Sequence, residues 1–244
     1  MKIRLDLLLV ERGHFPTRAK AQAALMAGRV KVQGKDRPKP GDLLSADAYV
    51  EVLADACPYV SRGGLKLAGA LDAFALDVAG RTALDLGAST GGFTDCLLKR
   101  GAAKVFAVDV GHGQLDAKLR ADARVVNLEK THARDLDPAT FSPPPTLAVV
   151  DVSFISLTLV LKPLLACLKR PADLVALVKP QFELGPKKTP KGIVKDEAHR
   201  AEALERVRAT AKDLALEERG VIESPLAGAK GNREWLVHWR LSPL

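Results

Sequence analysis

The first 55 residues carry an apolar pattern that changes from a helical to an alternating period. Two groups of apolar residues have the spacing of a helix face, and these are Leu5, Leu8 and Leu9, and then Ala21, Ala24 and Leu25. Gly13 and Gly28 follow these groups as helix stops, and Thr17 is placed to cap the second helix. An alternating segment over 30–32 and a second one over 49–53 predict short strands on either side of a proline-glycine turn. The pattern therefore predicts a small α+β domain.

Residues 54–60 interrupt these patterns. They show neither a helical nor an alternating period, and they include Pro58. Because a segment without apolar periodicity buries little surface, we predict a linker over residues 56–60. This linker separates a small domain at 1–55 from a larger domain at 61–244.

From residue 61 onward, continuous apolar runs alternate with helical patterns. The expected strands are Thr82–Leu86, Lys104–Asp109, Arg124–Asn127, Leu147–Val152, Asp173–Lys179, Val221–Pro225 and Glu234–Leu241. Helical spacing is most regular over 197–218. Apolar runs that alternate with helices predict a parallel sheet with helices on both faces, which is a Rossmann-like α/β fold. Ligands of such folds bind at the carboxyl ends of the strands.

Length and composition fit one large domain or one medium domain plus a small one, and the charge narrows the kind of partner. The 244 residues are 47% hydrophobic and 27% charged, which is enough for a sizeable core. The net charge of +8 is distributed unevenly, because residues 1–40 hold ten Lys or Arg residues against three acids. Such an excess favours an anionic partner, either nucleic acid or an acidic membrane surface.

Several other classes of protein are excluded by residue spacing. Cys57, Cys96 and Cys167 have no CxxC spacing, which argues against a disulfide framework or a zinc finger. The five histidines have no metal-ligand spacing, so we expect no metal. Asp6 interrupts the N-terminus where a signal peptide needs an apolar stretch, and charged residues break the apolar region 147–168. We therefore expect a soluble cytoplasmic protein.

A glycine-rich turn follows the first strand of the larger domain. It spans 85–94 with the sequence DLGASTGGFT, and it matches neither the G-x-G-x-x-G dinucleotide motif nor a P-loop. Its opening acid suits a ligand with an ammonium group, and Asp109 ends the next strand, where a carboxylate accepts ribose hydroxyls. The pair resembles the S-adenosylmethionine site of class I methyltransferases. This resemblance assigns cofactor binding to Asp85, Gly87, Ala88, Ser89, Gly91, Gly92, Phe93 and Asp109.

Four ionisable residues lie in motifs near strand ends, away from this turn. They are Lys66 in SRGGLKL, Asp151 in DVSFIS, Lys179 in VKPQFE and Glu234 in NRE. Methyl transfer to a hydroxyl needs side chains that align the oxygen and manage its proton. Together the four resemble the Lys-Asp-Lys-Glu tetrad of FtsJ-like ribose 2′-O-methyltransferases.

Short motifs in the basic first domain resemble the S4 RNA-binding domain. They are RLD at 4–6, RG at 12–13, TR at 17–18, GRVKVQG at 28–34 and KPGD at 39–42. The resemblance implies an RNA surface that includes Arg4, Arg18, Lys20, Arg29 and Lys31. In the larger domain we predict RNA contacts from Arg62 and from the loop lysines Lys187, Lys188, Lys191 and Lys195, for which a solvated loop is the alternative.

An S4 domain ahead of an FtsJ-like domain is the arrangement of the TlyA family, which is also called hemolysin-like. The family's position for bonding the adenine amino group is usually Asn, whereas this chain has His132, and a neutral imidazole nitrogen can accept the same bond. Asp135 is the substitute at this position.

Membership of this family implies methyl transfer from S-adenosylmethionine to a cytidine 2′-hydroxyl of ribosomal RNA, free or within a subunit. The longer family members act on the RNA of both subunits. Because this chain begins almost at the S4 signature and ends soon after its last strand, we expect activity on 23S rRNA, with 16S rRNA as the further target to test. Lys179 is the candidate that deprotonates or orients the hydroxyl. A free lysine has a pKa of about 10.4, so the first role needs a neutral amine.

Two other functions compete with this one. A membrane-active cytolysin, suggested by the family's label, needs a basic amphipathic helix, but segment 197–218 mixes both charge signs on its polar face. A non-catalytic RNA-binding factor for ribosome assembly would keep the fold, but the complete tetrad argues against it. The sequence does not indicate the oligomeric state.

Overall fold

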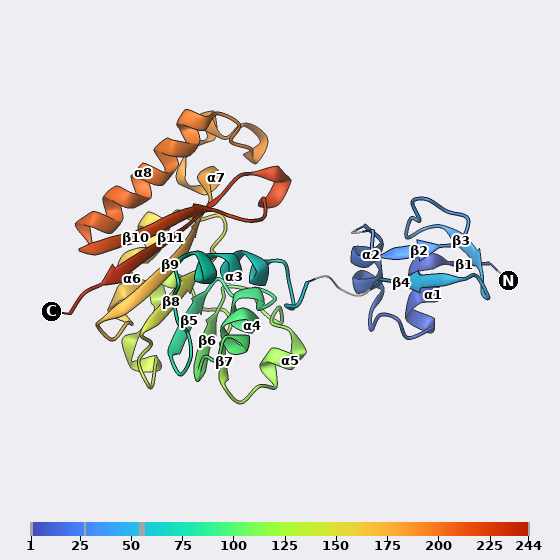
Figure 1. Cartoon of the computed structure of the whole chain (residues 1–244), viewed down its shortest axis with the longest axis horizontal. Helices are drawn as coiled ribbons and strands as arrows, with labels where there is room; N and C mark the ends of the chain where they lie inside the picture. The colour runs from blue at the N-terminus through green and yellow to red at the C-terminus, as the bar shows by residue number, and fades with distance from the viewer. Residues whose placement is uncertain (1, 27, 54–56, 244) are drawn as a thin grey trace. The chain divides into compact units, whose positions relative to one another are not determined.

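The computed structural model describes residues 2–26, 28–53 and 57–243 (Figure 1). Its contacts divide the chain into two compact units, Met1–Ala56 and Cys57–Leu244. Within the described residues, no helix combines the length and the apolar character that crossing a membrane requires.

The N-terminal unit is a small α+β domain with two antiparallel strand pairs. Its elements are β1 (Lys2–Arg4), α1 (Leu5–Glu11), α2 (Arg18–Met26), β2 (Val30–Val32), β3 (Leu43–Ser45) and β4 (Val50–Val52). β1 pairs with β3 and β2 pairs with β4. Leu5 and Leu9 pack with the apolar face of α2 and with β2, which confirms the predicted helix faces. The sequence pattern missed β1 and β3, whose sequences KIR and LLS lack the two alternating apolar residues that β2 and β4 have.

The C-terminal unit alternates strands and helices. Up to the sheet centre its elements are α3 (Gly63–Ala73), β5 (Thr82–Leu86), α4 (Gly92–Lys99), β6 (Lys104–Val108), α5 (Ala117–Arg120), β7 (Val125–Leu128), η1 (Ala133–Asp135), η2 (Pro138–Thr140) and β8 (Leu147–Val150). The remaining elements are α6 (Leu157–Ala166), β9 (Ala172–Val178), α7 (Pro180–Glu183), η3 (Pro186–Lys188), η4 (Pro190–Gly192), α8 (Glu197–Asp213), β10 (Leu216–Glu223), η5 (Ala229–Gly231) and β11 (Trp235–Leu241).

Seven strands form one sheet in the order β10-β11-β9-β8-β5-β6-β7. The five strands from β9 to β7 are parallel, as predicted. The expectation of a wholly parallel sheet is wrong, because β11 runs antiparallel to both β9 and β10. A short connection at 224–234 joins β10 to β11 as a hairpin, and a hairpin can only make an antiparallel pair.

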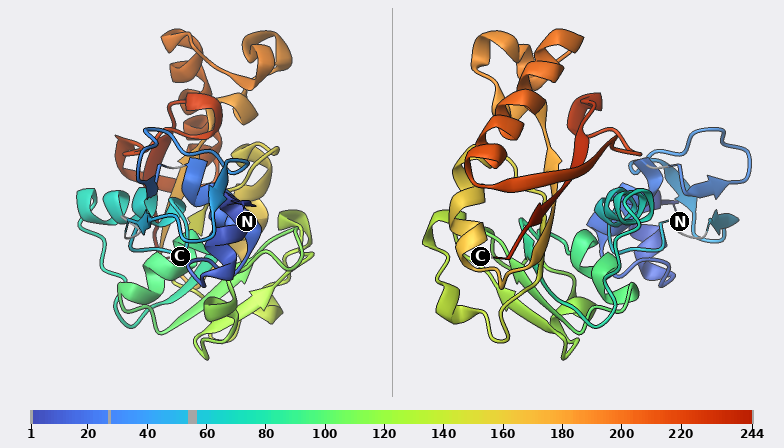
Figure 2. Two further views of the ribbon diagram at one scale, coloured as in Figure 1. Left: turned by 90° about the vertical axis from the view of Figure 1, so that its right-hand side faces the viewer. Right: turned by 60° about the vertical axis from the view of Figure 1, so that its left-hand side comes forward.

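Helices cover both faces of this sheet (Figure 2). Successive residues of a strand point to opposite faces. On β8, Ala148 and Val150 pack in the cluster formed with α6 and α8. Leu147 and Val149 pack in the second cluster, which includes residues of α3, α4 and α5. Because both faces are buried, β8 is apolar throughout its length, which is the pattern that made it recognisable in the sequence.

The helix predicted over 197–218 ends earlier, at Asp213. Ala215 has a positive φ of 57°, which breaks the helix, and β10 begins at Leu216 instead of the predicted Val221. Leu214 and Leu216 both pack against the same core cluster as α8. The apolar spacing therefore continues past the end of the helix, which explains the error.

Residues 57–60, predicted as part of a linker, pack against α4. The backbone N–H of Val60 donates to the Asp95 carboxylate at 2.8 Å, and the Tyr59 ring lies 5.2 Å from Lys99 Nζ. A Cβ at Gly64 would collide with the Tyr59 ring. These contacts attach the segment to the C-terminal unit, while Ala56 lies outside the described residues.

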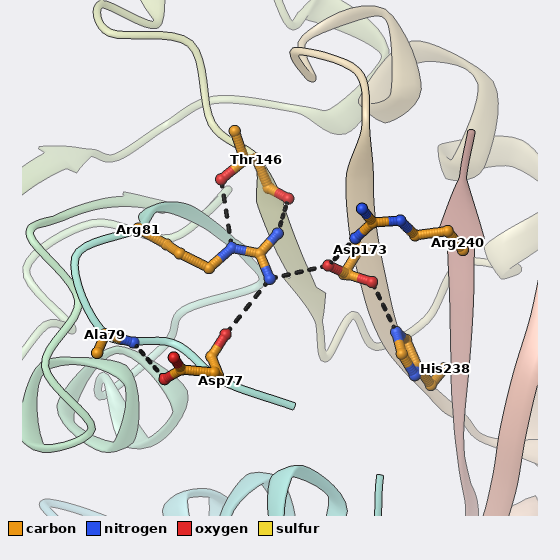
Figure 3. Close-up of polar contacts among 7 residues, drawn as sticks. All are labelled: Asp77, Ala79, Arg81, Thr146, Asp173, His238 and Arg240. Atoms are coloured by element: carbon orange, nitrogen blue, oxygen red, sulfur yellow. Dashed lines mark hydrogen bonds and ion pairs between the residues drawn. The ribbon is translucent and has the colours of Figure 1, made fainter. Parts of the chain in front are cut away.

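A buried carboxylate joins strands at the edge where the parallel strands begin (Figure 3). Asp173 of β9 accepts hydrogen bonds from Arg81 Nη1 at 2.8 Å and from Arg240 Nη1 at 2.5 Å, and it pairs with His238 Nε2 at 2.9 Å. Burial opposes ionisation, but the bonds from His238, Arg240 and Arg81 outweigh it and hold the pKa of Asp173 well below its usual range. Arg81 also donates to the carbonyl of Thr146, the residue before β8. The network therefore fixes the ends of β5, β8, β9 and β11 relative to one another.

Candidate active site

The predicted site residues of the C-terminal unit gather where parallel strands end. The glycine turn follows β5, Asp109 follows β6, Asp151 follows β8 and Lys179 follows β9. Because these four strands run parallel, their carboxyl ends meet at one edge of the sheet, opposite the Asp173 network.

The four residues of the predicted tetrad form two ion pairs. Lys179 Nζ lies 2.5 Å from Asp151 Oδ1 and donates to Ser153 Oγ at 2.8 Å. Lys66 Nζ donates to Glu234 Oε2 at 2.6 Å, and the side chains of these two residues are only 11% and 2% exposed. The fold therefore brings together residues that are up to 168 positions apart in the sequence.

The tetrad residues come from different kinds of element. Lys66 lies on the first turn of α3, and Glu234 directly precedes β11. Gly228, in the turn before β11, presses against Glu234 so closely that a Cβ there would collide with the carboxylate. Lys66, Asp151, Lys179 and Gly228 all line one cavity, so the two ion pairs border the same space.

This cavity, which we call the catalytic cavity, has a volume of about 430 Å³ and continues into a larger cofactor cavity of about 840 Å³. Four residues border both cavities, and they are Gly87, Ser89, Asp151 and Ser153. Of the predicted cofactor residues, Ala88, Gly92 and Phe93 line the catalytic cavity, whereas Asp109 and His132 line the cofactor cavity. Asp85 and Gly91 are not among the described residues that line either cavity.

The glycines of the turn are needed for packing within the protein itself. A Cβ at Gly87 would approach the Asp151 carbonyl oxygen to 2.6 Å, and Gly87 has a φ of +88°. A Cβ at Gly91 would collide with Leu119, and one at Gly92 would collide with Ser61 Oγ. The resemblance assigned these glycines to cofactor binding, and at each of them the space that a Cβ would take is filled by a neighbouring part of the chain.

Asp85 is completely buried behind the turn. One carboxylate oxygen, Oδ2, accepts a hydrogen bond from Thr94 Oγ1 at 2.6 Å, and the other has no hydrogen-bond partner among the described residues. Burial raises the pKa of Asp85 to about 7, with smaller contributions from the charges of Asp151 and Asp109, while the Thr94 bond opposes the rise.

Asp109 holds the loop after β6 in place. Its two oxygens accept hydrogen bonds from the backbone N–H groups of Ser89 at 2.8 Å and Gly111 at 2.6 Å. Gln114, which the sequence analysis missed, lines the cofactor cavity and lies 3.2 Å from Ser89 Oγ. In the sequence, the glycine-rich segment that follows Asp109 could have indicated a ligand-binding loop that contains Gln114.

An exposed apolar rim surrounds the cofactor cavity, and the sequence analysis missed it as well. Phe154 is 92% exposed with a φ of +65°, an uncommon backbone conformation for a bulky residue. Val110, Ile155 and Leu159 are the other exposed apolar residues of this cavity wall. The signal was an aromatic residue three positions after Asp151, in a loop where burial is not expected.

The basic residues predicted to bind RNA in the N-terminal unit have different surroundings. Arg4 and Arg18 both donate to Asp6, at 3.0 and 2.8 Å, and the bond from Arg4 contributes most to holding the pKa of this buried carboxylate well below its usual range. Their side chains remain 42% and 50% exposed. Lys20 and Lys31 are exposed and Arg29 is half-buried. Arg4 and Arg18 thus support the fold while keeping exposed surface.

The basic residues predicted for the C-terminal unit also differ. Arg62 is exposed and lines the catalytic cavity. Lys187 is exposed, whereas Lys188 donates to Glu202 Oε1 at 2.6 Å, which offsets its charge. Lys191 is joined to Lys230, whose Nζ donates to the Lys191 carbonyl oxygen at 2.8 Å. Arg62 is therefore the one of these residues that borders the candidate active site directly.

Comparisons with known proteins agree with this geometry. Residues 59–241 match the family of FtsJ-like methyltransferases, and residues 3–48 match the S4 domain family. The 16S/23S rRNA (cytidine-2′-O)-methyltransferase TlyA of Mycobacterium tuberculosis is 47% identical over 241 residues, covering 98% of this chain and 90% of that protein.

Among the solved structures, one is similar to this chain in both sequence and structure, and another is similar in fold alone. A Streptococcus thermophilus protein named as a hemolysin is 42% identical with a TM-score of 0.79, covering 99% of this chain and 89% of that one. An S-adenosylmethionine-dependent methyltransferase from Listeria monocytogenes is 15% identical with a TM-score of 0.54, covering 74% of this chain and 98% of that one, and it shows the fold alone. The chain belongs to the TlyA family, in which an S4 domain precedes an FtsJ-like methyltransferase domain, and it is a methyltransferase of that family.

Proposed function

We propose that the protein transfers a methyl group from S-adenosylmethionine to the ribose 2′-hydroxyl of a cytidine in ribosomal RNA. The observation that carries the proposal is the position of the two ion pairs, Lys66–Glu234 and Lys179–Asp151. They border a cavity that continues into the cofactor cavity, so a hydroxyl and a methyl donor can meet between them. The relative from Mycobacterium tuberculosis is named for this reaction on 16S and 23S rRNA.

The residues present fit S-adenosylmethionine, which supplies a methyl group activated by a sulfonium. The carboxylate of Asp109 suits the ribose hydroxyls, and His132 lines the same cavity for the adenine. At the other end, Gly87 and Ser89 of the glycine turn line both cavities, and the carboxylate of Asp85, buried behind the turn, would direct negative charge toward the cationic group of the cofactor without touching it.

The ion pairs hold the groups that we propose to act on the hydroxyl. Asp151 and Ser153 fix Lys179 Nζ, and Asp151 stabilises the positive charge of Lys179. Held in this way, Lys179 can donate a hydrogen bond to the 2′-oxygen and orient a lone pair for in-line attack. Removal of the hydroxyl proton by Lys179 requires its neutral amine, and a pH–rate profile separates the two roles.

Basic and aromatic surfaces support RNA as the substrate. Exposed Arg62 borders the catalytic cavity and is proposed to contact a phosphate. The exposed ring of Phe154 offers a flat apolar surface to a base beside the reacting ribose. In the N-terminal unit, the exposed basic residues Lys20 and Lys31 are proposed to bind the RNA backbone. We propose the cytoplasm as the site of action, because the substrate is ribosomal RNA.

Transfer of a labelled methyl group to purified 23S and 16S rRNA, and to both ribosomal subunits, tests the proposal. We expect label in the large-subunit RNA at a cytidine 2′-hydroxyl, located by mapping of the modified ribose, and label in 16S rRNA would extend the substrate range. If RNA binds but no substrate is labelled, the protein is a non-catalytic RNA-binding factor. Leakage of vesicles on addition of the protein would instead support a membrane-active hemolysin.

A further inference from the structure

The two loops that carry Asp151 and Lys179 contact each other at successive points. Asp151 and Ser153 contact the Lys179 amine at the first point. Next along both loops, the rings of Phe154 and Phe182 lie 5.1 Å apart.

The third contact involves Glu183, whose Oε1 accepts a hydrogen bond from the backbone N–H of Leu157 at 2.9 Å. Its other oxygen accepts a hydrogen bond from the Ser156 hydroxyl. The segment 151–157 therefore runs along 179–183 with polar contacts at both ends and an aromatic contact between them.

Glu183 is a buried carboxylate that the tetrad does not include. It is 3% exposed, and burial raises its pKa, whereas the bonds from Leu157 and Ser156 oppose the rise. It accepts from the first turn of α6, a position where a carboxylate satisfies N–H groups that have no partner within the helix. Ser156 Oγ also lies 2.7 Å from Thr158 Oγ1, so the contact is continuous with the start of the helix.

Helix geometry connects Glu183 to Lys179. The two residues are four positions apart, and α7 forms a single helical turn between them. Lys179 is the extended residue that precedes this turn, and both side chains point toward the loop after β8, where Lys179 contacts Ser153 and Glu183 contacts Leu157. Arg206 of α8 holds the far end of this turn, since its Nη1 donates to the Glu183 carbonyl oxygen at 2.9 Å.

We propose that Glu183 is a positioning residue for methyl transfer: it fixes the loop 151–157 so that Ser153 meets the Lys179 amine. The loop has one end tied to the sheet at β8 and the other tied to Glu183 at the start of α6. Asp151 itself is held to β5, since its backbone N–H donates to the Leu86 carbonyl oxygen at 3.0 Å. Without the second tie, the loop beyond Asp151 can shift toward solvent, and the contact between Ser153 and Lys179 separates. The proposal rests on the proposed function, because the Lys179 amine that it positions is assigned to the methyl-transfer reaction.

Three variants of the full-length protein test this role. Glu183→Ala removes both hydrogen bonds, whereas Glu183→Gln keeps an oxygen for the Leu157 N–H and offers an amide to the Ser156 hydroxyl. Asp196→Ala is the matched control, because Asp196 caps α8 by accepting from Ala198 N at 2.8 Å and has no contact with the loop. The readouts are the single-turnover rate constant at saturating cofactor and rRNA, cofactor affinity by calorimetry, and Tm.

We expect Glu183→Ala to reduce the rate constant by about 10²-fold, as displacement of a reacting group by about 1 Å does, with cofactor Kd within about threefold of wild type. Glu183→Gln restores the rate to within about tenfold, and Asp196→Ala lowers Tm without lowering the rate. If Glu183→Ala keeps the wild-type rate, or if Glu183→Gln is as slow as Glu183→Ala, the positioning role is refuted.

Crystal structures of the Ala and Gln variants supply a readout that needs no substrate. We expect the hydrogen bond from Lys179 Nζ to Ser153 Oγ, 2.8 Å in the native chain, to be lost in the Ala variant and kept in the Gln variant. An unchanged contact in the Ala variant overturns the proposal even if wild-type protein methylates no rRNA. Inactive wild-type protein overturns only the proposed function.

Discussion

Lys66 and Glu234 form the more deeply buried of the two ion pairs, and replacing them singly and together separates stability from catalysis. Lys66→Met leaves the Glu234 carboxylate, only 2% exposed, without its cation. Breaking a buried pair in this way costs about 3–5 kcal/mol of unfolding free energy. Glu234→Gln costs less, because the charge left behind is on Lys66, which lines the catalytic cavity and can reach solvent. The double variant leaves no buried charge, so its stability returns to within about 1–2 kcal/mol of wild type.

Urea unfolding followed by tryptophan fluorescence measures this effect in the relevant part of the chain. Both tryptophans of the protein, Trp235 and Trp239, lie on β11, so the signal reports on the C-terminal unit. Methyl transfer to rRNA is measured on the same samples, and all three variants are expected to lose it. A stable double variant without activity assigns the pair to catalysis. Recovery of activity in the double variant, or strictly additive losses of stability, would refute this reasoning.

Three further predictions concern single side chains. Lys179→Ala is expected to lower kcat by about 10²–10⁴-fold with cofactor and RNA affinities retained in binding titrations, and an active variant would contradict the assignment. Because the pKa of Asp85 is raised from 3.8 to about 7, folding stability falls as pH rises between these values, and Asp85→Asn should flatten that part of the stability–pH curve measured by urea unfolding. Phe154→Ala should raise KM for RNA with only a small change in Tm, since the ring is 92% exposed; an unchanged KM would argue against contact with the substrate.

The sequence indicated the tetrad because its members share a recognisable setting. Asp151 and Lys179 each follow a continuous apolar run, and an ionisable residue at such a place is conspicuous. Their pairing depends on the order of strands in the sheet, which brings β8 and β9 together. Strand order and pair distances needed the structure, although the parallel arrangement of the central strands, and with it the edge where the candidate site residues gather, followed from the pattern.

The features that sequence reasoning missed depend on single long-range contacts. Glu183 lies in the VKPQFE motif, but the positioning role that we propose for it depends on its hydrogen bond from the Leu157 N–H, which is 26 residues away. Tyr59 and Val60 contact Lys99 and Asp95 of α4, and two consecutive residues are too few to show a period in the sequence. Arg18 was identified from its charge, whereas its bond to the buried Asp6 depends on the packing of two helices. No local period encodes contacts of this kind.

The packing of the glycine turn bears on the thermodynamics of cofactor binding. Gly87, Gly91 and Gly92 are each held against another part of the protein, so the turn has its shape before any ligand arrives. A preformed loop loses little conformational freedom when it binds, and the entropy penalty of ordering it is correspondingly small. Gly91 packs against Leu115 and Leu119, which belong to the hydrophobic core, so the glycine turn and the core are in direct contact. The shape of the glycine turn is therefore linked to the core, and substitutions of Leu115 or Leu119 are expected to weaken cofactor binding by disturbing the turn.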